Sequence, residues 1–524
     1  MRYRFSTKES SLLNSDLLAC DEPYHRLKYQ EIVMPECNRL RVAGLLFLMS
    51  LVTYACFLQG FLQDPRNANV ASRMFLTLSL VGNGELSIDR YASLTIDKAE
   101  SHGRFYSDKA PGLSLLAVPV TALLWRPIMN IYQHRNPTAT EPWTRDWPPA
   151  YYLFSYFAML STSALITAAS VAAMFLLALS VFGNPVSAIL VAGAYGFATP
   201  MFGWATAFVG HAPAAGLLSV GLACAHFLAA QNGTNLRRDC LLVVAGVACL
   251  TWAVVTEFTA APVAAAVAVY GSRKIISASD NRVMLGGCAL ITGFVFLLPL
   301  LIYNHLAFGA PWRLGYQSVT GFPGAKLGFL GIQLPQLKVL YQIICGERRG
   351  IIVLCPLLLL IPMGVLQMSI RDGQHRLALM IVVVIAYYLA LNSSYYYWDG
   401  GWSTGPRHIT GMLPFACLPL GSVWNYASRG MRAFVLLLVS VSLALAVASA
   451  STGMFAPTNI DDLLFDYLIP GDSRAVLPVY LFGWRFRYFL LGLFLVWVCL
   501  GLMIARQFAR PSQGHAAGGM LQLG

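Results

Sequence analysis

The sequence predicts an all-α polytopic membrane protein, a bundle of about twelve transmembrane helices with a long first loop outside the membrane. Three observations support this fold class. The 524 residues are 57% hydrophobic and only 11% charged, with a mean hydropathy of +0.60, and a soluble domain of this length cannot bury so much apolar surface. Apolar runs of about 20 residues, enough to span a bilayer, recur along the chain. Lys and Arg gather in alternate loops, as they do on the cytoplasmic side of membrane proteins.

Ten apolar runs each fit one transmembrane helix. They cover residues 43–62, 151–180, 186–203, 209–230, 284–306, 350–370, 377–394, 409–427, 431–452 and 484–505. A further run, 240–270, is long for one helix and carries Glu257 in its middle, where a charge at the bilayer centre costs about 2.5 to 3.5 kcal/mol. We therefore expect two short helices here, with Glu257 near the turn between them.

Residues 112–126 are also apolar, but prolines interrupt them. Pro111, Pro119 and Pro127 leave only about thirteen unbroken apolar positions, so we expect an interfacial helix and not a span. With this choice, the loops rich in Arg and Lys near residues 237, 273, 371 and 429 fall on the same side as the N-terminus. The positive-inside rule then predicts that both termini are cytoplasmic.

The chain is expected to form one membrane domain over residues 43–506, between a cytoplasmic N-terminal tail (1–42) and a cytoplasmic C-terminal tail (507–524). Its first external loop covers 63–150. The eleven cysteines show no CxxC pattern and indicate neither a disulfide framework nor a zinc site. Lys and Arg outnumber Asp and Glu, 36 to 24, but the cytoplasmic loops account for this excess, so membrane lipids and not nucleic acid are the expected partners.

The first external loop combines acidic and basic side chains ahead of the interfacial helix. Its candidate catalytic carboxylates are Asp64, Asp89, Asp97 and Asp108, and Lys109 follows directly in the stretch "SDKAPG". A carboxylate can take a proton from an attacking hydroxyl, and a lysine can neutralise a phosphate at the depth of the lipid headgroups. The pattern favours a lipid-phosphate substrate. The alternative is a solvated loop that its lysines anchor to the membrane.

A second cluster lies in "SSYYYWDGGWSTGPRH", residues 393–408. Arg407 follows a turn-forming Gly-Pro pair and can bind a phosphate with two parallel hydrogen bonds. Trp398 and His408 are candidate substrate-binding residues in the same stretch. The alternative for the aromatic residues is simple anchoring at the membrane interface.

Further candidates stand at the expected external ends of the helices. His211, Glu257 and Tyr316 are candidate substrate-binding residues, and Arg349 is a candidate phosphate-binding residue beside Arg348. A structural role is the alternative for each: a buried histidine commonly serves as a hydrogen-bonding group, and aromatic and basic residues commonly anchor helix ends.

These motifs resemble those of the GT-C superfamily of membrane glycosyltransferases. "GRFYSDKAPG" resembles a G-x-x-Y-x-(E/D)-K-x-P element in the first external loop of bacterial members of this superfamily. These members are similar to lipid A aminoarabinose transferases and protein O-mannosyltransferases. "YNHLAFGAP-x-x-x-GY", "ERRGIIVLCP" and "W-x-GG-x-S-x-GPR" resemble a bacterial branch usually described as phospholipid-carrier-dependent glycosyltransferases. The resemblance runs from about residue 43 to residue 427.

The resemblance implies a GT-C-type bundle in the bacterial inner membrane, with its active site on the periplasmic side. It implies a hexosyl- or pentosyltransferase that moves a sugar from a polyprenyl-phosphate donor, with inversion, to lipid A or core saccharide, another glycan or a protein. Lys109 would contact the donor phosphate. The base would be a carboxylate of the first external loop, for which Asp64 is the nearest match, although the usual acidic pair is missing and Asp89, Asp97 and Asp108 remain competitors. No clear Asp-x-Asp pair is present, so no cofactor is assigned and a divalent metal stays open.

Two other functions fit parts of the sequence. A transporter or flippase for lipid-linked saccharides would place ionisable residues deep in several helices, whereas here they gather on the expected external side. A non-catalytic scaffold that binds polyprenyl phosphate or lipopolysaccharide would retain Lys109 and Arg407 but would need no base.

Overall fold

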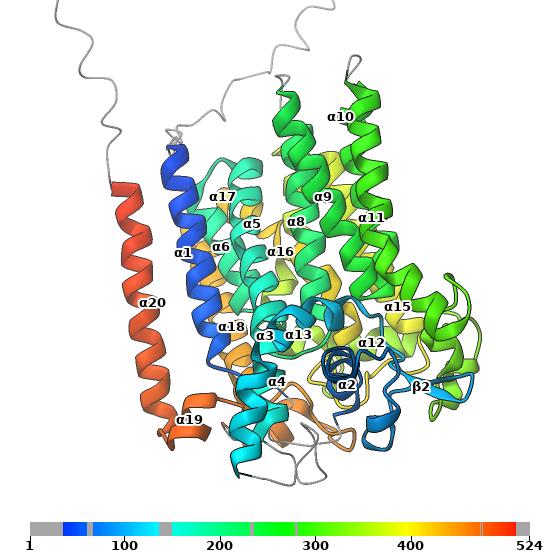
Figure 1. The fold of residues 1–524 in the computed structure, drawn as a ribbon. Helices are drawn as coiled ribbons and strands as arrows, with labels where there is room; N and C mark the ends of the chain where they lie inside the picture. The colour runs from blue at the N-terminus through cyan, green and yellow to red at the C-terminus, as the bar shows by residue number, and fades with distance from the viewer. Residues whose placement is uncertain are drawn as a thin grey trace, which may run out of the picture. The chain divides into compact units, whose positions relative to one another are not determined.

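Long helices that run roughly side by side make up most of the computed structural model (Figure 1). The structure describes residues 35–59, 67–135, 149–230, 235–277, 281–471, 473 and 475–509. The longest helices that the structure describes are α1 (Glu36–Ala55), α3 (Gly112–Arg135), α5 (Leu165–Phe182), α8 (His211–Ala229), α9 (Leu236–Thr256), α11 (Arg282–Phe308), α15 (His375–Ser394), α18 (Arg429–Thr452) and α20 (Phe486–Ala509).

Eight helical stretches within the described ranges are long and apolar enough to cross a membrane. They are Gly112–His134, Ala150–Phe182, His211–Ala229, Leu236–Thr256, Arg282–Phe308, His375–Ser394, Arg429–Thr452 and Phe486–Phe508, and Pro185–Phe197 and Pro356–Ile370 are shorter apolar helices. The chain is therefore a multi-pass membrane protein. The total of twelve spans stays a prediction.

The expected break at Glu257 is confirmed. Helix α9 ends at Thr256, a short 3-10 turn, η3 (Phe258–Ala260), follows, and α10 (Ala261–Ser277) then begins. Glu257 itself has an extended backbone, with φ −146° and ψ 115°. A carboxylate in the middle of a continuous membrane helix would be costly, and the break places it where it can reach polar partners.

Proline-rich segments form short helices in place of continuous ones. The predicted span 186–203 consists of α6 (Pro185–Phe197) and α7 (Met201–Ala205). The span 350–370 consists of α13 (Ile351–Leu354), η6 (Pro356–Leu360) and α14 (Ile361–Ile370), and the span 409–427 consists of η7 (Arg407–Met412), α16 (Leu413–Cys417) and α17 (Leu420–Tyr426). Each break lies at or next to a proline, which lacks the N–H that would continue the helix.

The segment expected at the interface is longer than predicted. Helix α3 (Gly112–Arg135) continues through Pro119 and Pro127, so the expectation that the prolines limit it to residues 112–126 is wrong. Neighbouring helices support a proline-containing helix of this kind, and α3 packs against α2 (Ala68–Asn83), α4 (Pro149–Met159) and α9. Its location at the membrane surface stays a prediction, because its length and composition also suit a span.

The two ends of the bundle differ. Figure 1 shows the start of α1, the starts of α9 and α11 and the end of α20 at one end, with α2, the strand β2, α12 (Leu337–Cys345) and α19 (Leu477–Phe482) at the other. Arg237 and Arg282, in the first turns of α9 and α11, thus lie at the same end of the bundle as the start of α1, as the positive-inside rule predicts. The assignment of that end to the cytoplasm stays a prediction.

The stretch "HGRFYSDKAPG" forms a hairpin that leads into α3. After α2 and the turn η1 (Asp89–Leu94), strand β1 (Ala99–Ser101) pairs antiparallel with β2 (Arg104–Tyr106). The two residues between the strands, His102 and Gly103, have φ values of +52° and +71°, the left-handed pair that a tight two-residue hairpin turn requires. The hairpin sends the chain directly into Asp108 and Lys109.

Candidate active site

The hairpin and the broken helices surround a cavity of about 380 Å³, which we call the polar cavity. Its charged lining residues are Arg73, Asp97, Asp108, Lys109, Glu257 and Arg407. Its other lining residues include His211, Tyr316, Asn392, Tyr395, Tyr396, Tyr397 and His408, together with apolar side chains such as Phe258, Phe322, Phe329, Leu330 and Ile332. Such a combination of aromatic walls with a few charged groups is typical of small-molecule sites.

Lys109 lies between two carboxylates. Its Nζ is 2.7 Å from Oδ2 of Asp108 and 2.9 Å from Oδ2 of Asp97, and it lies 5.6 Å from the centre of the Tyr316 ring. Burial alone would lower the pKa of Lys109, but the two carboxylates together raise it above its ordinary value. Burial raises the pKa of Asp108, although Lys109 opposes the shift. The lysine is therefore a permanent cation in this cavity.

Close backbone contacts fix this centre. A Cβ atom at Gly112 would lie 2.6 Å from the carbonyl oxygen of Val255, so only glycine allows the start of α3 to meet the end of α9. A Cβ atom at Gly315 would lie 2.9 Å from the carbonyl oxygen of Asp108. The Oδ1 atom of Asp108 also accepts a hydrogen bond from the Ser72 hydroxyl at 3.2 Å. The glycines thus bring the hairpin, α9 and the loop after α11 together.

A second ion pair joins α2 to the break after α9. The Nη2 atom of Arg73 donates to Oε1 of Glu257 at 2.7 Å, and Arg73 also hydrogen-bonds Asn69. The Nδ1 atom of His211 lies 3.7 Å from the same Glu257 oxygen. Burial raises the pKa of Glu257, against the effect of Arg73, Lys109 and Arg407. Because Arg73 is only 1% exposed, it depends on this carboxylate for charge compensation.

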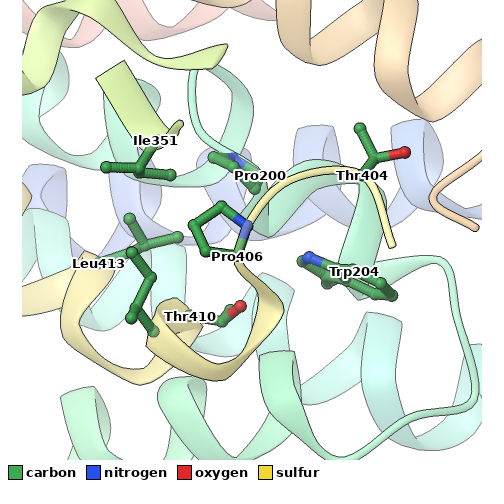
Figure 2. A pocket seen from close by; sticks show the side chains of 8 residues that line it. Pro200, Trp204, Ile351, Thr404, Pro406, Thr410 and Leu413 are labelled. Carbon is green, nitrogen blue, oxygen red and sulfur yellow. The ribbon is translucent and has the colours of Figure 1, made fainter. Parts of the chain in front are cut away.

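Arg407 differs from the other two cations. No carboxylate in the described part of the chain forms an ion pair with it, and its buried Nε atom has no hydrogen-bond partner there. Figure 2 shows the surroundings of the preceding residue: Pro406 lines a small pocket together with Pro200, Trp204, Ile351, Thr404, Ile409, Thr410 and Leu413. The proline ring restricts the backbone just before Arg407, which lines the polar cavity.

His408 lies beside this arginine. Its ring centre is 5.8 Å from that of His211 and 5.2 Å from that of Tyr395. Burial and the neighbouring Arg407 lower the pKa of His408 to about 3, so the imidazole is neutral at physiological pH. It can bind a ligand through hydrogen bonds without adding charge.

The structure does not bring Arg349 to the cavity, and its assignment to a phosphate needs correction. Its guanidinium is buried and donates to the carbonyl oxygens of Arg348, Asp399, Gly401 and Pro457 at 3.1 to 3.3 Å. The adjacent Arg348 pairs with the Asp399 carboxylate at 3.0 Å. Arg349 therefore ties the 395–408 loop to the segment after α18 and uses four of its five N–H donors on carbonyl oxygens there.

Two other predicted residues do not line the cavity. Asp89 pairs with Arg104 at 2.9 Å on the exposed side of the hairpin, which removes it from the candidate bases. Trp398 is half-buried away from the lining, and its carbonyl oxygen accepts a hydrogen bond from Asn392. Asp64 lies outside the described residues. The lining does include the other predicted residues: Asp97, Asp108, Lys109, Arg407, His211, Glu257, Tyr316 and His408.

The sequence interpretation missed Arg73, Asn69 and Asn392. Arg73 offers the clearest signal, because it interrupts the apolar stretch "VASRMFLTLSLV", where a charge needs a partner. Across the described ranges, no group of three or more His, Cys, Asp and Glu side chains lies close enough together to hold a metal ion. Asp64 is outside that search.

Comparison with known proteins identifies the fold. No protein-family model matches the sequence, and no curated protein matches it. Comparison with solved structures shows a GT-C-like fold, the fold class of a group of membrane glycosyltransferases, which confirms the fold that the sequence motifs suggested.

The solved structures that match share little sequence with this chain. The archaeal oligosaccharyltransferase of Archaeoglobus fulgidus, AglB, superposes with a TM-score of 0.50 at 13% identity, over 80% of this chain and 57% of that one. This chain thus corresponds to little more than half of the archaeal enzyme's length. ArnT from Cupriavidus metallidurans, bound to undecaprenyl phosphate, matches 90% of this chain and 73% of its own at 15% identity, with a TM-score of 0.47.

Proposed function

We propose that this protein is a membrane glycosyltransferase that moves a sugar from a polyprenyl-phosphate donor to an acceptor of the cell envelope. The polar cavity carries the proposal, because it combines paired carboxylates and apolar walls with a cation that has no carboxylate partner among the described residues. The GT-C-like fold supports it, since the archaeal relative has been solved with an inhibitory peptide and a dolichol phosphate. The acceptor would be lipid A or core saccharide, another glycan, or a protein.

The placement of the charges in the cavity suits a phosphate. The cavity has three cations, Arg73, Lys109 and Arg407, and the three carboxylates of the described lining pair with the first two. Arg407 is the cation without a carboxylate among the described residues, and its planar guanidinium suits phosphate oxygens. Lys109 has three N–H donors; it donates one to Asp108 and also forms an ion pair with Asp97, which leaves at least one donor for the phosphate. We therefore assign the donor phosphate to Arg407, with Lys109 in support.

Transfer with inversion needs a base. In the proposed step, the acceptor hydroxyl attacks the anomeric carbon, its proton passes to a carboxylate, and the bond to the donor phosphate breaks. Both oxygens of Asp108 are engaged, by Ser72 and Lys109. Asp97 contacts Lys109 through Oδ2 alone, and its Oδ1 has no protein donor in the described part of the chain. We therefore prefer Asp97 to Asp108, and Asp64 stays a candidate beside it.

The proposal includes a location. The lining residues come from the end of the bundle opposite the start of α1, which the positive-inside rule assigns to the cytoplasm. We therefore propose that catalysis takes place on the periplasmic face of the bacterial inner membrane, where polyprenyl-phosphate sugars can meet envelope acceptors.

The test combines binding and envelope chemistry. Purified protein in nanodiscs should bind undecaprenyl phosphate, and Arg407→Ala should weaken this binding at least about tenfold, as expected for a charge-assisted hydrogen bond. Arg429→Ala, an exposed arginine at the start of α18, is the matched control and should bind as wild type does. Mass spectrometry of a deletion strain should show a sugar missing from one envelope glycan, restored by wild type and Arg429→Ala but not by Arg407→Ala. An unchanged glycan profile in the deletion strain would contradict the proposal.

A further inference from the structure

Aromatic, aliphatic and basic side chains are exposed together around the start of α20, far along the chain from the polar cavity. They come from the end of α19, from the connection that follows it and from the first turn of α20. The apolar and aromatic members are between 49% and 69% exposed, and such a concentration is typical of an interaction surface. We call these residues the basic aromatic surface: Tyr480, Leu481, Phe482, Trp484, Arg485, Arg487 and Tyr488.

The basic aromatic surface lies at the edge of a candidate membrane span. The span covers Phe486–Phe508, so Arg485 directly precedes it and Arg487 is its second residue. The span packs against α1, where Nε1 of Trp497 donates to Oγ1 of Thr53 at 2.9 Å, and few of its other residues are buried in the protein. Because lipid covers the exposed sides of a membrane helix, the residues at its start lie at the depth of the lipid headgroups.

The two arginines have no carboxylate that offsets their charge. Neither forms an ion pair in the described part of the chain, and no Asp or Glu occurs between residues 475 and 509. The guanidinium of Arg487 lies 4.9 Å from the centre of the Tyr488 ring, and its Nη2 atom donates to the Tyr488 hydroxyl at 3.2 Å. Both partners are uncharged, so the basic aromatic surface keeps its positive charge and attracts anions.

These arginines also stand at the end of the bundle where the charge pattern does not call for them. Figure 1 shows α19, directly before them, at the end opposite the start of α1 and the end of α20. The positive-inside rule accounts for Arg237 and Arg282 at the α1 end, and it gives Arg485 and Arg487 no role in the orientation of the protein. A bound anion gives them one.

We infer that the basic aromatic surface binds anionic phospholipids of the surrounding membrane. Arg485 and Arg487 bind the phosphodiester oxygens, for which a planar guanidinium is well suited. The rings of Phe482 and Trp484, whose centres are 6.1 Å apart, lie against the glycerol and the upper acyl chains, where aromatic residues are favoured. None of these residues lines the polar cavity, so the inference does not depend on the proposed glycosyl transfer.

Lipid titration of the purified full-length protein tests the inference. Native mass spectrometry in detergent measures the affinity for phosphatidylglycerol, which is anionic, and for phosphatidylcholine with the same acyl chains, which has no net charge. Phosphatidylglycerol should bind at least about fivefold more tightly. Arg485→Gln and Arg487→Gln should each weaken its binding about fivefold, the usual contribution of one basic side chain near an anionic lipid surface, and should leave phosphatidylcholine binding within about twofold.

A matched control separates the surface from the net charge of the protein. Arg506→Gln removes the same charge from an exposed arginine at the other end of α20, and it should leave phosphatidylglycerol binding within about twofold. Because Arg485 and Arg487 are exposed, their glutamine variants should keep the thermal midpoint of wild type in phosphatidylcholine nanodiscs. A fivefold loss in Arg506→Gln as well would assign the effect to net charge and overturn the inference.

Two other results would also contradict the inference. If Arg485→Gln and Arg487→Gln both bind phosphatidylglycerol as wild type does, the anionic lipid binds elsewhere on the protein. Light scattering in detergent tests the other occupant of such a surface, a second copy of this chain. If wild type is a dimer and Trp484→Ser is a monomer, the basic aromatic surface is a subunit interface and not a lipid site.

Discussion

Replacement of Lys109 by methionine is the most direct test of how the polar cavity is held together. The change keeps a long unbranched side chain but removes the charge between Asp97 and Asp108. At the observed distances of 2.7 and 2.9 Å, each contact corresponds to about 6 kcal/mol of Coulomb energy at an effective dielectric constant of about 20. Desolvation offsets most of this, and loss of one partner of a buried pair typically costs about 3 to 5 kcal/mol.

We therefore expect Lys109→Met to lower the free energy of unfolding by about 3 to 5 kcal/mol and to abolish transfer. The two carboxylates then repel each other, which raises the folded-state pKa of one of them above its unfolded value. A raised folded-state pKa stabilises the protein at low pH, and the effect is lost as the pH rises through that pKa. The difference in the free energy of unfolding between wild type and Lys109→Met should therefore shrink as the pH falls towards about 4, where carboxyl groups ordinarily become protonated.

The assay is thermal and denaturant unfolding of the purified protein in detergent, with transfer measured in parallel. The double variant Lys109→Met with Asp108→Asn removes one of the two repelling charges and should recover most of the stability but none of the transfer. Lys338→Met, an exposed lysine on α12, is the control. A Lys109→Met protein as stable as wild type, or a double variant no more stable than the single one, would refute the reasoning.

Three further predictions follow from the site. Arg349→Lys should lower the thermal midpoint and weaken undecaprenyl phosphate binding, because one amine cannot replace a guanidinium that donates to four carbonyl oxygens. A normal midpoint together with normal binding would contradict the anchoring role of Arg349. Asp97→Asn should slow transfer about 10²- to 10⁴-fold, the usual contribution of a general base. Asp89→Asn, on the exposed side of the hairpin, is the control and should leave the transfer rate within about twofold. If both variants transfer sugar at the same rate, Asp64 becomes the first candidate for the base. Single-cysteine labelling of intact cells with an impermeant reagent should modify position 399 and not position 238, and labelling at 238 would overturn the predicted sidedness.

The sequence by itself determined the positions of the helical segments. Over the described residues, each apolar run is mostly helical, as one helix or as several short ones, because a segment in the membrane must satisfy its own backbone hydrogen bonds. The break at Glu257 was predictable for the same local reason, since a central carboxylate is costly in lipid. The length of α3 was not, because neighbouring helices stabilise a helix across Pro119 and Pro127.

Only the tertiary structure separated the site residues from similar residues nearby. Arg349 and Arg407 each adjoin a turn-forming residue, yet one is surrounded by carbonyl oxygens and the other faces the polar cavity without a carboxylate among the described residues. Asp89 and Asp97 flank the same turn, yet only Asp97 reaches Lys109. Arg73 meets Glu257 across 184 positions of the chain. Local hydropathy sets where a helix lies, but the partner of a buried charge depends on which distant segments pack together, and no local pattern carries that information.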